Sequence, residues 1–390
     1  MLALNPVVLL IILYLTVNFL SMLIGCFSGE IQVETSFFHE NPEYLIYSFI
    51  LQCCCLFVLY FFYSFFFART KNVDLKLENK WGLLLCILQI SFAIFNYTMG
   101  VNLAGSTERI EGGSLINYFF IFFQPDNLFV IISLCLKSPM FFWINIIIYT
   151  FSMMLRGWMG GVFIIFFLII TRFQYIKVSI RLLMKLFSFF VILLVLMPVI
   201  IEAKWAMRTG VPVITFINAI PSYFTVERYS EGVGYLLNRF QHVGHLALIL
   251  ENSSTLNSDY MNARFSNYFW DGLPQVILSK VYNLEIYKLT SYIVEFIFGI
   301  PNPSWNVNIG IVGWFFILKW ESIIFTLYLF CLLFFPYYIV SKYAGKKLLT
   351  ILSCFSIVYL FHGWLGAYIN LALFACLVSI FANIKLHKSV

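Results

Sequence analysis

Charged residues are scarce in this sequence. Asp, Glu, Lys and Arg make up only 11% of its 390 residues, whereas 62% are hydrophobic. A soluble globular domain carries roughly 25% charged residues, so a soluble core could not accommodate this much apolar surface. Most of the chain must therefore face lipid or other buried helices, which predicts an all-α polytopic integral membrane protein.

The motifs of nucleotide-dependent and metal-dependent enzymes are missing as well. The sequence contains no Walker loop, no dinucleotide-binding glycine fingerprint and no His-Glu-x-x-His. It also has no Gly-x-Ser-x-Gly nucleophile elbow. Energy for any reaction must then come from the substrate itself or from a gradient, and we expect no cofactor and no metal. The basic residues lie in short clusters between apolar runs, which excludes a nucleic-acid groove.

A disulfide framework is also missing. The nine cysteines lie in or beside apolar runs, and the long polar segment has none. The run Cys53–Cys55 lacks the spacing of a zinc site. We therefore predict that these thiols pack as small apolar side chains.

Apolar runs of the length that a membrane helix needs recur along the chain. We place ten spans at about 5–26, 45–68, 81–100, 115–136, 138–155, 158–171, 183–201, 309–340, 348–362 and 364–384. The first run has neither the basic start nor the cleavage motif of a signal peptide, which predicts an uncleaved helix. The run 309–340 is too long for one simple span and predicts a separate tilted or interfacial segment before Glu321.

The distribution of charge predicts the orientation of these spans. More than half of the 24 Lys and Arg residues lie in short connections on one side, such as 69–80, 172–185 and 342–347. The connection 27–44 on the other side holds four glutamates and no Lys or Arg. By the positive-inside rule both termini are cytoplasmic.

The longest connection then falls on the outer side. We expect seven spans in 1–201, a large periplasmic loop in 202–307 and three spans in 308–390. A connection of this length is rarely without structure, and helix-like patterns occur at 235–250 and 284–298. The segment therefore predicts a small extracytoplasmic helical cap.

The helix predicted at 235–250 carries the first candidate site. Arg239, His242 and His245 are spaced three residues apart, so on one helix they share a face. Arg offers a planar, permanently charged fork for phosphate oxygens, and His can take or give a proton near neutral pH. The same pattern is typical of an amphipathic helix with its wet face at an interface. A metal at His242 and His245 is not expected, because no flanking ligand completes a set.

Four more residues are candidates for the same chemistry. Glu251 is a further candidate base, and Arg228 precedes Arg239 by eleven residues. Arg208 follows the seventh span at headgroup depth, where it binds a lipid phosphate or anchors the helix end. Arg156 lies between two apolar runs, where an arginine is costly unless it is paired or near the interface. It contacts an anionic headgroup or anchors a hairpin.

The whole pattern resembles the bacterial O-antigen polymerases, the Wzy-type oligosaccharide repeat-unit polymerases. The resemblance rests on ten or so spans rich in Phe, Ile, Leu and Tyr, with one outer loop that bears arginines. The local likenesses are Ser152-Met-Met-Leu-Arg-Gly-Trp-Met-Gly160, the segment 239–245, and Asn306-Val-Asn-Ile-Gly-Ile-Val-Gly313. Some members carry two outer loops with an arginine followed by glycine eleven positions later. No arginine here has that partner.

The resemblance implies a multi-span, GT-C-like glycosyltransferase of the bacterial inner membrane. Its substrates would be undecaprenyl-diphosphate-linked oligosaccharides, and its other partners would be membrane lipids and a chain-length regulator protein. The arginines expected to neutralise the leaving diphosphate are Arg208, Arg239, Arg228 and Arg156. The expected bases for the acceptor hydroxyl are His242, His245 and Glu251.

Two other functions stay open. An O-antigen ligase shares the multi-span plan with one outer loop, and it transfers finished glycan to lipid A-core. A lipid-linked oligosaccharide flippase or another transporter typically has repeated halves and charges at mid-membrane. Here we detect no repeated halves, and the charges gather at the membrane edges and in the outer loop.

Overall fold

Helices account for almost all of the secondary structure in the computed structural model. It describes residues 5–34, 36–70, 74–102, 115–158, 160–173, 180–209, 211–301 and 305–387. The contacts divide the chain into two compact units, which are described separately. The first comprises Met1–Pro6 and Leu77–Arg239, and the second comprises Val7–Lys76 and Phe240–Val390. The predicted division at 201 and 307 followed membrane topology rather than contacts, and it stays a prediction.

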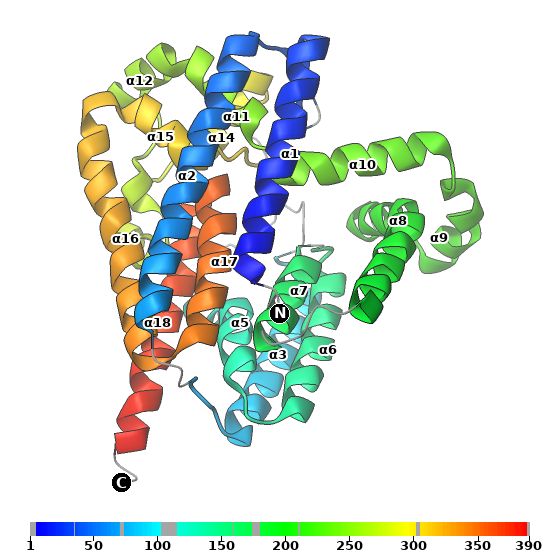
Figure 1. The fold of residues 1–390 in the computed structure, drawn as a ribbon, viewed down its shortest axis with the longest axis vertical. Helices are drawn as coiled ribbons and strands as arrows, with labels where there is room; N and C mark the ends of the chain where they lie inside the picture. Colours follow the sequence, from blue (N-terminus) through cyan, green and yellow to red (C-terminus); the bar gives the residue numbers. More distant parts are fainter. Residues whose placement is uncertain are drawn as a thin grey trace. The chain divides into compact units, whose positions relative to one another are not determined.

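The first unit is built of helices from the middle of the chain (Figure 1). Its elements are α3 (Asn79–Met99), α4 (Leu115–Phe123), α5 (Pro125–Cys135), α6 (Pro139–Leu155), α7 (Gly161–Arg172), α8 (Ile180–Thr209), α9 (Val213–Ala219), the 3₁₀ turn η1 (Ile220–Tyr223) and α10 (Val226–Phe240), whose last residue belongs to the second unit.

Buried amides join α3 to α6 in this unit. The Gln89 Nε2 donates to Asn145 Oδ1 at 2.8 Å, and the Asn145 Nδ2 donates to the carbonyl of Gly82 at 3.2 Å. Gly82 permits this approach, because a Cβ there would lie 2.8 Å from the Phe141 Cβ. Polar side chains therefore fix the register of two apolar helices whose surfaces alone would specify it weakly.

The second unit joins the N-terminal and C-terminal parts of the chain. Its elements are α1 (Pro6–Ser28), β1 (Glu30–Val33), β2 (Ser36–His39), α2 (Pro42–Arg69), α11 (Val243–Glu251), α12 (Ser253–Met261), η2 (Tyr268–Trp270), α13 (Leu273–Val281), α14 (Leu289–Phe298), α15 (Gly310–Leu318), η3 (Lys319–Glu321), α16 (Ser322–Tyr343), α17 (Lys346–His362) and α18 (Leu365–His387). Helices α2, α16, α17 and α18 pack along one another (Figure 1).

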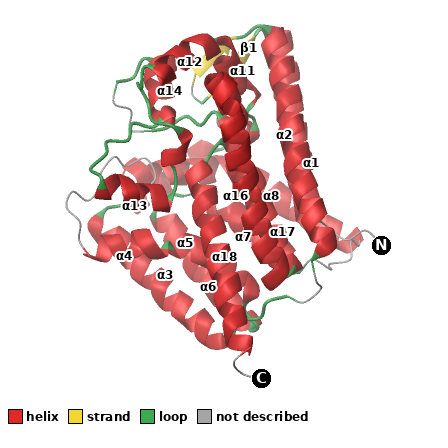
Figure 2. Cartoon of the chain, turned by 90° about the vertical axis from the view of Figure 1, so that its left-hand side faces the viewer, coloured by secondary structure: helices red, strands yellow, loops and turns green. Residues whose placement is uncertain are grey.

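A small antiparallel hairpin accompanies these helices. Strands β1 and β2 pair with Glu30 opposite His39 and Val33 opposite Ser36. Helix α11 lies against β1 (Figure 2). The contact is close at Gly244, where a Cβ would come within 2.8 Å of the Val33 side chain. The hairpin thus forms a platform for α11 between the end of α1 and the start of α2.

The structure supports an all-α membrane protein, with fewer long spans than the sequence suggested. Five helical segments in the described residues are long and apolar enough to cross a membrane: Pro6–Ser28, Pro42–Arg69, Asn79–Met99, Gly310–Tyr343 and Leu365–Ala382. The pair α4 and α5, bent by 41°, adds a sixth if it is one span. Each predicted stretch overlaps a helix, but α6, α7 and α17 are only 17, 12 and 17 residues long. The count of about ten and the GT-C-like architecture stay predictions.

The long run 309–340 is divided, as its length predicted. Helix α15 ends at Leu318, η3 follows, and α16 begins at Ser322. Lys319 lies at the junction with a positive φ of 50°, which is uncommon for a residue other than glycine. The chain therefore changes direction just before Glu321.

The predicted continuous helix over 235–250 is wrong. Helix α10 ends at Phe240, and α11 begins at Val243 with His242 as its N-cap. Asn18 of α1 satisfies both sides of the break: its Nδ2 donates to the Phe240 carbonyl at 3.0 Å, and its Oδ1 accepts the His242 N–H at 2.7 Å. The Gln241 Oε1 then accepts the Gly244 N–H at 3.2 Å. The hydrogen bonds that a continuous helix would make are replaced by side chains distant in sequence.

Asn18 is buried, with only 1% of its surface exposed. Asn18→Ala should destabilise the protein by about 2–4 kcal/mol, because it leaves a buried N–H and a buried carbonyl unpaired at about 1–3 kcal/mol each. Thermal unfolding of the purified protein in detergent measures the change. Asn262→Ala, on an exposed residue, is the matched control. Equal unfolding temperatures for the two variants would show that Asn18 does not hold the break.

Candidate functional site

Three buried histidines come together in the second unit. His242 and His245 lie at the start of α11, and His362 is the last residue of α17. The ring centroid of His242 is 4.5 Å from that of His245, in a stacked arrangement, and 4.8 Å from that of His362. The three residues are 3%, 5% and 7% exposed. This histidine cluster, His242, His245 and His362, holds three of the five histidines in the chain.

The first helix orients the cluster. The Tyr14 hydroxyl lies 2.8 Å from His362 Nε2, within hydrogen-bond distance. Asn18, one turn further along α1, fixes the backbone of His242. Tyr14 thus orients the ring of His362, and Asn18 fixes the main chain that carries His242.

Two glycines bring main chain against the cluster. Gly310 has a φ of +69°, and a Cβ there would lie 2.8 Å from the Phe361 carbonyl and 3.6 Å from His242 Nδ1. Gly363 has a φ of +79°, and its Cβ would meet the Gly310 nitrogen at 2.8 Å. Only glycine tolerates both the positive φ and the close approach.

Each histidine of α11 keeps one ring nitrogen without a hydrogen-bond partner. In the part of the chain that the structure describes, the buried Nδ1 atoms of His242 and His245 have none. Burial, together with the neighbouring His245 and His362, lowers the pKa of His242 well below 6.5. His242 is therefore neutral at pH 7, and one of its ring nitrogens carries a lone pair that can accept a proton.

The carboxylates nearest this region lie on the hairpin and at the far end of α11. The Glu34 Oε1 is 3.6 Å from His245 Nε2, which is an ion pair when the histidine is protonated. Glu251 ends α11, about 13 Å along the axis from His242 at 1.5 Å per residue. The structure therefore brings His242 and His245 together, and it does not bring Glu251 to them.

Glu251 instead affects the pKa of the carboxyl group of Glu40. Glu40 is 5% exposed, and in the described residues neither of its oxygens has a hydrogen-bond partner. Burial, followed by repulsion from Glu251, raises the pKa of Glu40 from 4.5 to about 7. The folded protein thus binds a proton at Glu40 more tightly than the unfolded chain does.

This proton binding gives a testable pH dependence. The stabilisation that Glu40 gains by protonation is fully present below about pH 4.5 and is lost as the pH rises through about 7. Glu40→Gln, a neutral isostere, should therefore stabilise the protein by about 1–2 kcal/mol at pH 8 and have little effect at pH 4.5. Thermal unfolding at the two pH values measures the difference. Glu43→Gln, on an exposed carboxylate of the same helix start, is the control, and a pH-independent effect of Glu40→Gln would contradict the assignment.

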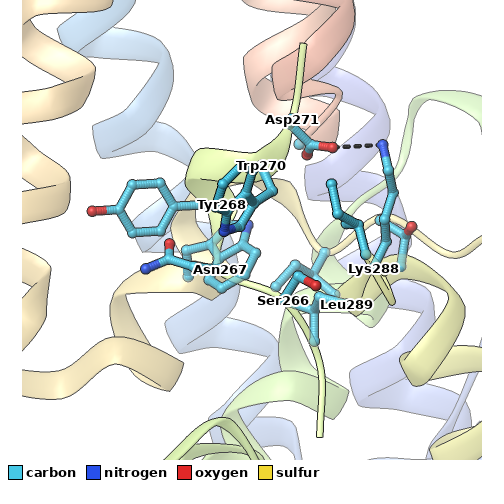
Figure 3. Close-up of a pocket in the computed structure, with 12 residues that line it drawn as sticks. Ser266, Asn267, Tyr268, Trp270, Asp271, Lys288 and Leu289 are labelled. Carbon is cyan, nitrogen blue, oxygen red and sulfur yellow. Dashed lines mark hydrogen bonds and ion pairs between the residues drawn. The ribbon is translucent and has the colours of Figure 1, made fainter. Parts of the chain in front are cut away.

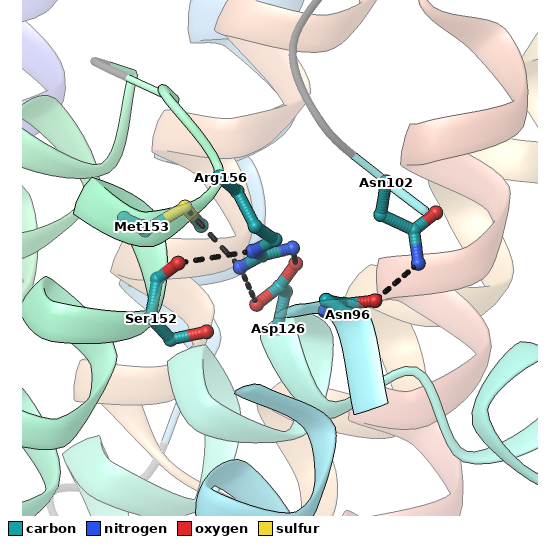
Figure 4. Close-up of polar contacts among 6 residues, drawn as sticks. All are labelled: Asn96, Asn102, Asp126, Ser152, Met153 and Arg156. Carbon is teal, nitrogen blue, oxygen red and sulfur yellow. Dashed lines mark hydrogen bonds and ion pairs between the residues drawn. The ribbon is translucent and has the colours of Figure 1, made fainter. Parts of the chain in front are cut away.

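Arg156, in the first unit, has a protein partner. Its guanidinium binds the Asp126 carboxylate through two parallel hydrogen bonds of 2.8 Å (Figure 4). Its Nε also donates to the Ser152 carbonyl at 3.3 Å, and the residue is only 3% exposed. This bidentate pair compensates the charge of Arg156, for which the sequence alone indicated no partner. This geometry joins α5 to the end of α6, and it leaves little capacity for a lipid diphosphate.

The other three arginines differ in their surroundings. Arg228 pairs with Glu202 at 2.7 Å and with Glu231 at 3.1 Å. Arg239 is exposed at the end of α10, where its guanidinium lies 4.9 Å from the centre of the Tyr235 ring. Arg208 lies in the last turn of α8, and the position of its side chain is outside the description. Arg239 is thus the described arginine whose charge is most available to a ligand.

The ion pair of Arg156 gives a prediction about stability. Asp126→Ala should destabilise the first unit by about 3–5 kcal/mol, because it leaves a buried guanidinium without its counter-charge. The double variant Asp126→Leu with Arg156→Met should cost less than the single one, because it removes both charges together. Denaturation of the purified proteins compares the variants. If the double variant were the least stable, the pair would not be compensated in the way its geometry indicates.

The sequence did not indicate His362, Tyr14 or Asn18. The available signal was weak: each is a polar residue inside or at the end of an apolar run, where polar groups usually have a partner. Nothing in the spacing links residue 14 to residue 362. Among the described residues, no group of three or more His, Cys, Asp or Glu side chains is placed to hold a metal ion.

Fold and site together define an all-α membrane protein with a buried histidine cluster at the start of α11 and the end of α17. Comparison of the chain with family models, with curated proteins and with solved structures gives no match.

Proposed function

We propose that the protein is an O-antigen polymerase of the bacterial inner membrane. It would join undecaprenyl-diphosphate-linked oligosaccharide repeats into polysaccharide at the periplasmic face, with both termini in the cytoplasm. The observation that carries the proposal is the stacked pair His242 and His245, buried at the start of α11 with unpartnered Nδ1 atoms. Membrane lipids and a chain-length regulator protein would be its other partners.

The chemistry of this reaction requires a base and stabilisation of an anion. The acceptor hydroxyl oxygen forms a bond to the anomeric carbon of the donor, and the bond from that carbon to the diphosphate oxygen breaks. A neutral imidazole takes the hydroxyl proton. The electron pair leaves with undecaprenyl diphosphate, so neither nucleotide nor metal is consumed in the step.

We assign the role of general base to His242 rather than to His245. It is neutral at pH 7, Asn18 holds its backbone, and His362 faces its ring. Its low pKa makes it a weak base in the resting protein, and the negative charge of a bound diphosphate would raise its proton affinity. The same bound group would therefore both supply the leaving anion and activate the base.

Arg239 and Arg208, both in the first unit, are by residue type the candidate ligands of the diphosphate. Arg239 is exposed, and its guanidinium lies 4.9 Å from the centre of the Tyr235 ring. Arg228 and Arg156 already bind carboxylates, so their part in the proposal is smaller. Glu251 would act on Glu40 rather than on the acceptor hydroxyl.

Two features favour alternatives that the same experiment distinguishes. The single large outer loop predicted from the sequence is equally a property of the O-antigen ligases. The bent pair α4 and α5 is typical of the broken helices of transporters and lipid-linked oligosaccharide flippases. A ligase defect leaves lipid A-core without any glycan, whereas a polymerase defect leaves core with a single repeat.

The test uses conservative replacement of each base in a cell that makes the polysaccharide. His242→Gln should reduce chains longer than one repeat by about 100-fold or more, because general base catalysis contributes about 10²–10⁴-fold. His245→Gln should reduce them less. Gel electrophoresis of the surface glycan gives the length distribution, and immunoblotting of membranes confirms that each variant is inserted.

His39→Gln is the matched control. It makes the same replacement in the same unit, on an exposed histidine of β2 that pairs with Glu30 at 3.3 Å outside the cluster. Long chains in the His242→Gln strain at the wild-type level would refute the catalytic role. Complete loss of glycan from the core would assign the protein to the ligases.

A further inference from the structure

A narrow groove in the second unit combines aromatic rings with a balanced ion pair. It is shallow and open to solvent, and its enclosed volume is only about 20 Å³, so a ligand would lie over its surface rather than inside it. Its lining includes Tyr268, Trp270 and Trp314 together with Asp271 and Lys288. None of these residues belongs to the histidine cluster. Ligand sites typically combine aromatic walls with a few convergent polar groups.

The walls of the groove are held in place by main-chain contacts. The Ser266 N–H donates to the Tyr287 carbonyl at 2.7 Å, which ties the two edges together. Asn267 fixes η2, because its Oδ1 accepts the Phe269 N–H at 3.3 Å and its Nδ2 donates to the Tyr260 hydroxyl at 3.0 Å. The turn that carries Trp270 is thus preformed, which lowers the entropic cost of binding.

The aromatic side chains form the base of the groove. Tyr268 and Trp314 are each 7% exposed, and they meet edge to face with their centroids 5.7 Å apart. Trp270 is only partly buried and lies beside Asp271 (Figure 3). An indole face offers apolar contact to the C–H groups of a ligand, and its N–H offers a hydrogen bond.

The charges in the groove select against an anion. The Lys288 Nζ lies 2.7 Å from Asp271 Oδ1, and the two side chains are 47% and 25% exposed (Figure 3). The pair is close to neutral as a whole, so it gives a phosphate no net attraction. An ammonium has three N–H donors and a carboxylate has about four acceptor sites, so one contact leaves capacity for further hydrogen bonds. Neighbouring donors and acceptors of this kind match vicinal hydroxyl groups.

The groove also adjoins the histidine cluster. Gly363 and Ile309 belong to its lining, and they are next in sequence to His362 and Gly310. Gly310 is the glycine whose missing Cβ would lie 3.6 Å from His242 Nδ1. Part of the groove lining is therefore next in sequence to residues that contact the cluster.

From these observations we infer that the groove is a pyranose-binding subsite. One sugar ring lies against Trp270, and its vicinal hydroxyls bind Asp271 and Lys288. The identity of the larger ligand as a lipid-linked oligosaccharide rests on the proposed function, whereas the preference for a neutral sugar ring rests on the groove alone.

The test is saturation-transfer NMR on the purified full chain, in a detergent without a sugar headgroup. The probes are the methyl pyranosides of glucose, galactose, mannose, rhamnose and N-acetylglucosamine. At least one should receive saturation from the wild type. Trp270→Ala should weaken its affinity by about tenfold, as expected for the loss of about 1.4 kcal/mol. Phe269→Ala, on the neighbouring exposed ring that does not line the groove, should leave the affinity unchanged.

Lys288→Met is a second variant in case Trp270→Ala does not fold. It changes a half-exposed side chain and should weaken binding of the same pyranoside by about threefold or more. The inference is overturned if no pyranoside receives saturation, if a folded Trp270→Ala or Lys288→Met binds as the wild type does, or if inorganic phosphate displaces the sugar.

The outcome is separable from that of the proposed function. Pyranoside binding that depends on Trp270, in a protein whose His242→Gln variant still makes long chains, would keep the subsite and reject the polymerase. Absence of pyranoside binding, with loss of long chains in His242→Gln, would keep the polymerase and reject the subsite.

Discussion

The interruption between α10 and α11 is the feature on which the rest of the site depends. Asn18 binds the carbonyl of Phe240 and the N–H of His242, and Gln241 caps the new helix while its Nε2 donates to the Gln32 carbonyl at 2.9 Å. Without these partners the chain would gain hydrogen bonds by continuing as one helix. His242 would then share a face with Arg239, and it would not occupy an N-cap beside His362. Two amide side chains, Asn18 and Gln241, therefore help to decide where the imidazole lies.

Buried polar groups elsewhere in the two units are satisfied to different degrees. Arg156 and Asp126 compensate each other fully, and Gln89 and Asn145 pair between helices. Glu40 and the Nδ1 atoms of His242 and His245 are the contrast, since they are buried with no partner in the described residues. A buried polar group without a hydrogen-bond partner costs free energy, and such groups often occur at functional sites. The described residues hold further buried polar atoms without a partner, such as Ser48 Oγ, Gln52 Oε1 and Gln89 Oε1, so the lack of a partner does not by itself distinguish a chemical role from a structural one.

The histidine cluster and the groove beside it form one continuous region of the second unit. Both are assembled from segments distant in sequence: α1, the long segment after residue 240, and the start and end of the helices near 310 and 362. Close main-chain approach at Gly310 and Gly363 brings the two together. The second unit thus holds both a buried imidazole that is neutral at pH 7 and the groove.

The sequence by itself indicated a helical membrane protein and the positions of its longest apolar helices. Apolar runs cannot be solvated, so α1, α2, α3 and α18 could be placed from length and composition alone. His242 and His245 were also found, because their spacing and polarity contrast with the apolar runs. The break at Gln241, the partner of Arg156, and the joining of Tyr14 and Asn18 to residues more than two hundred positions away were decided only by tertiary structure. Those outcomes depend on which side chain reaches which backbone group in three dimensions, and local periodicity carries no information about such a contact.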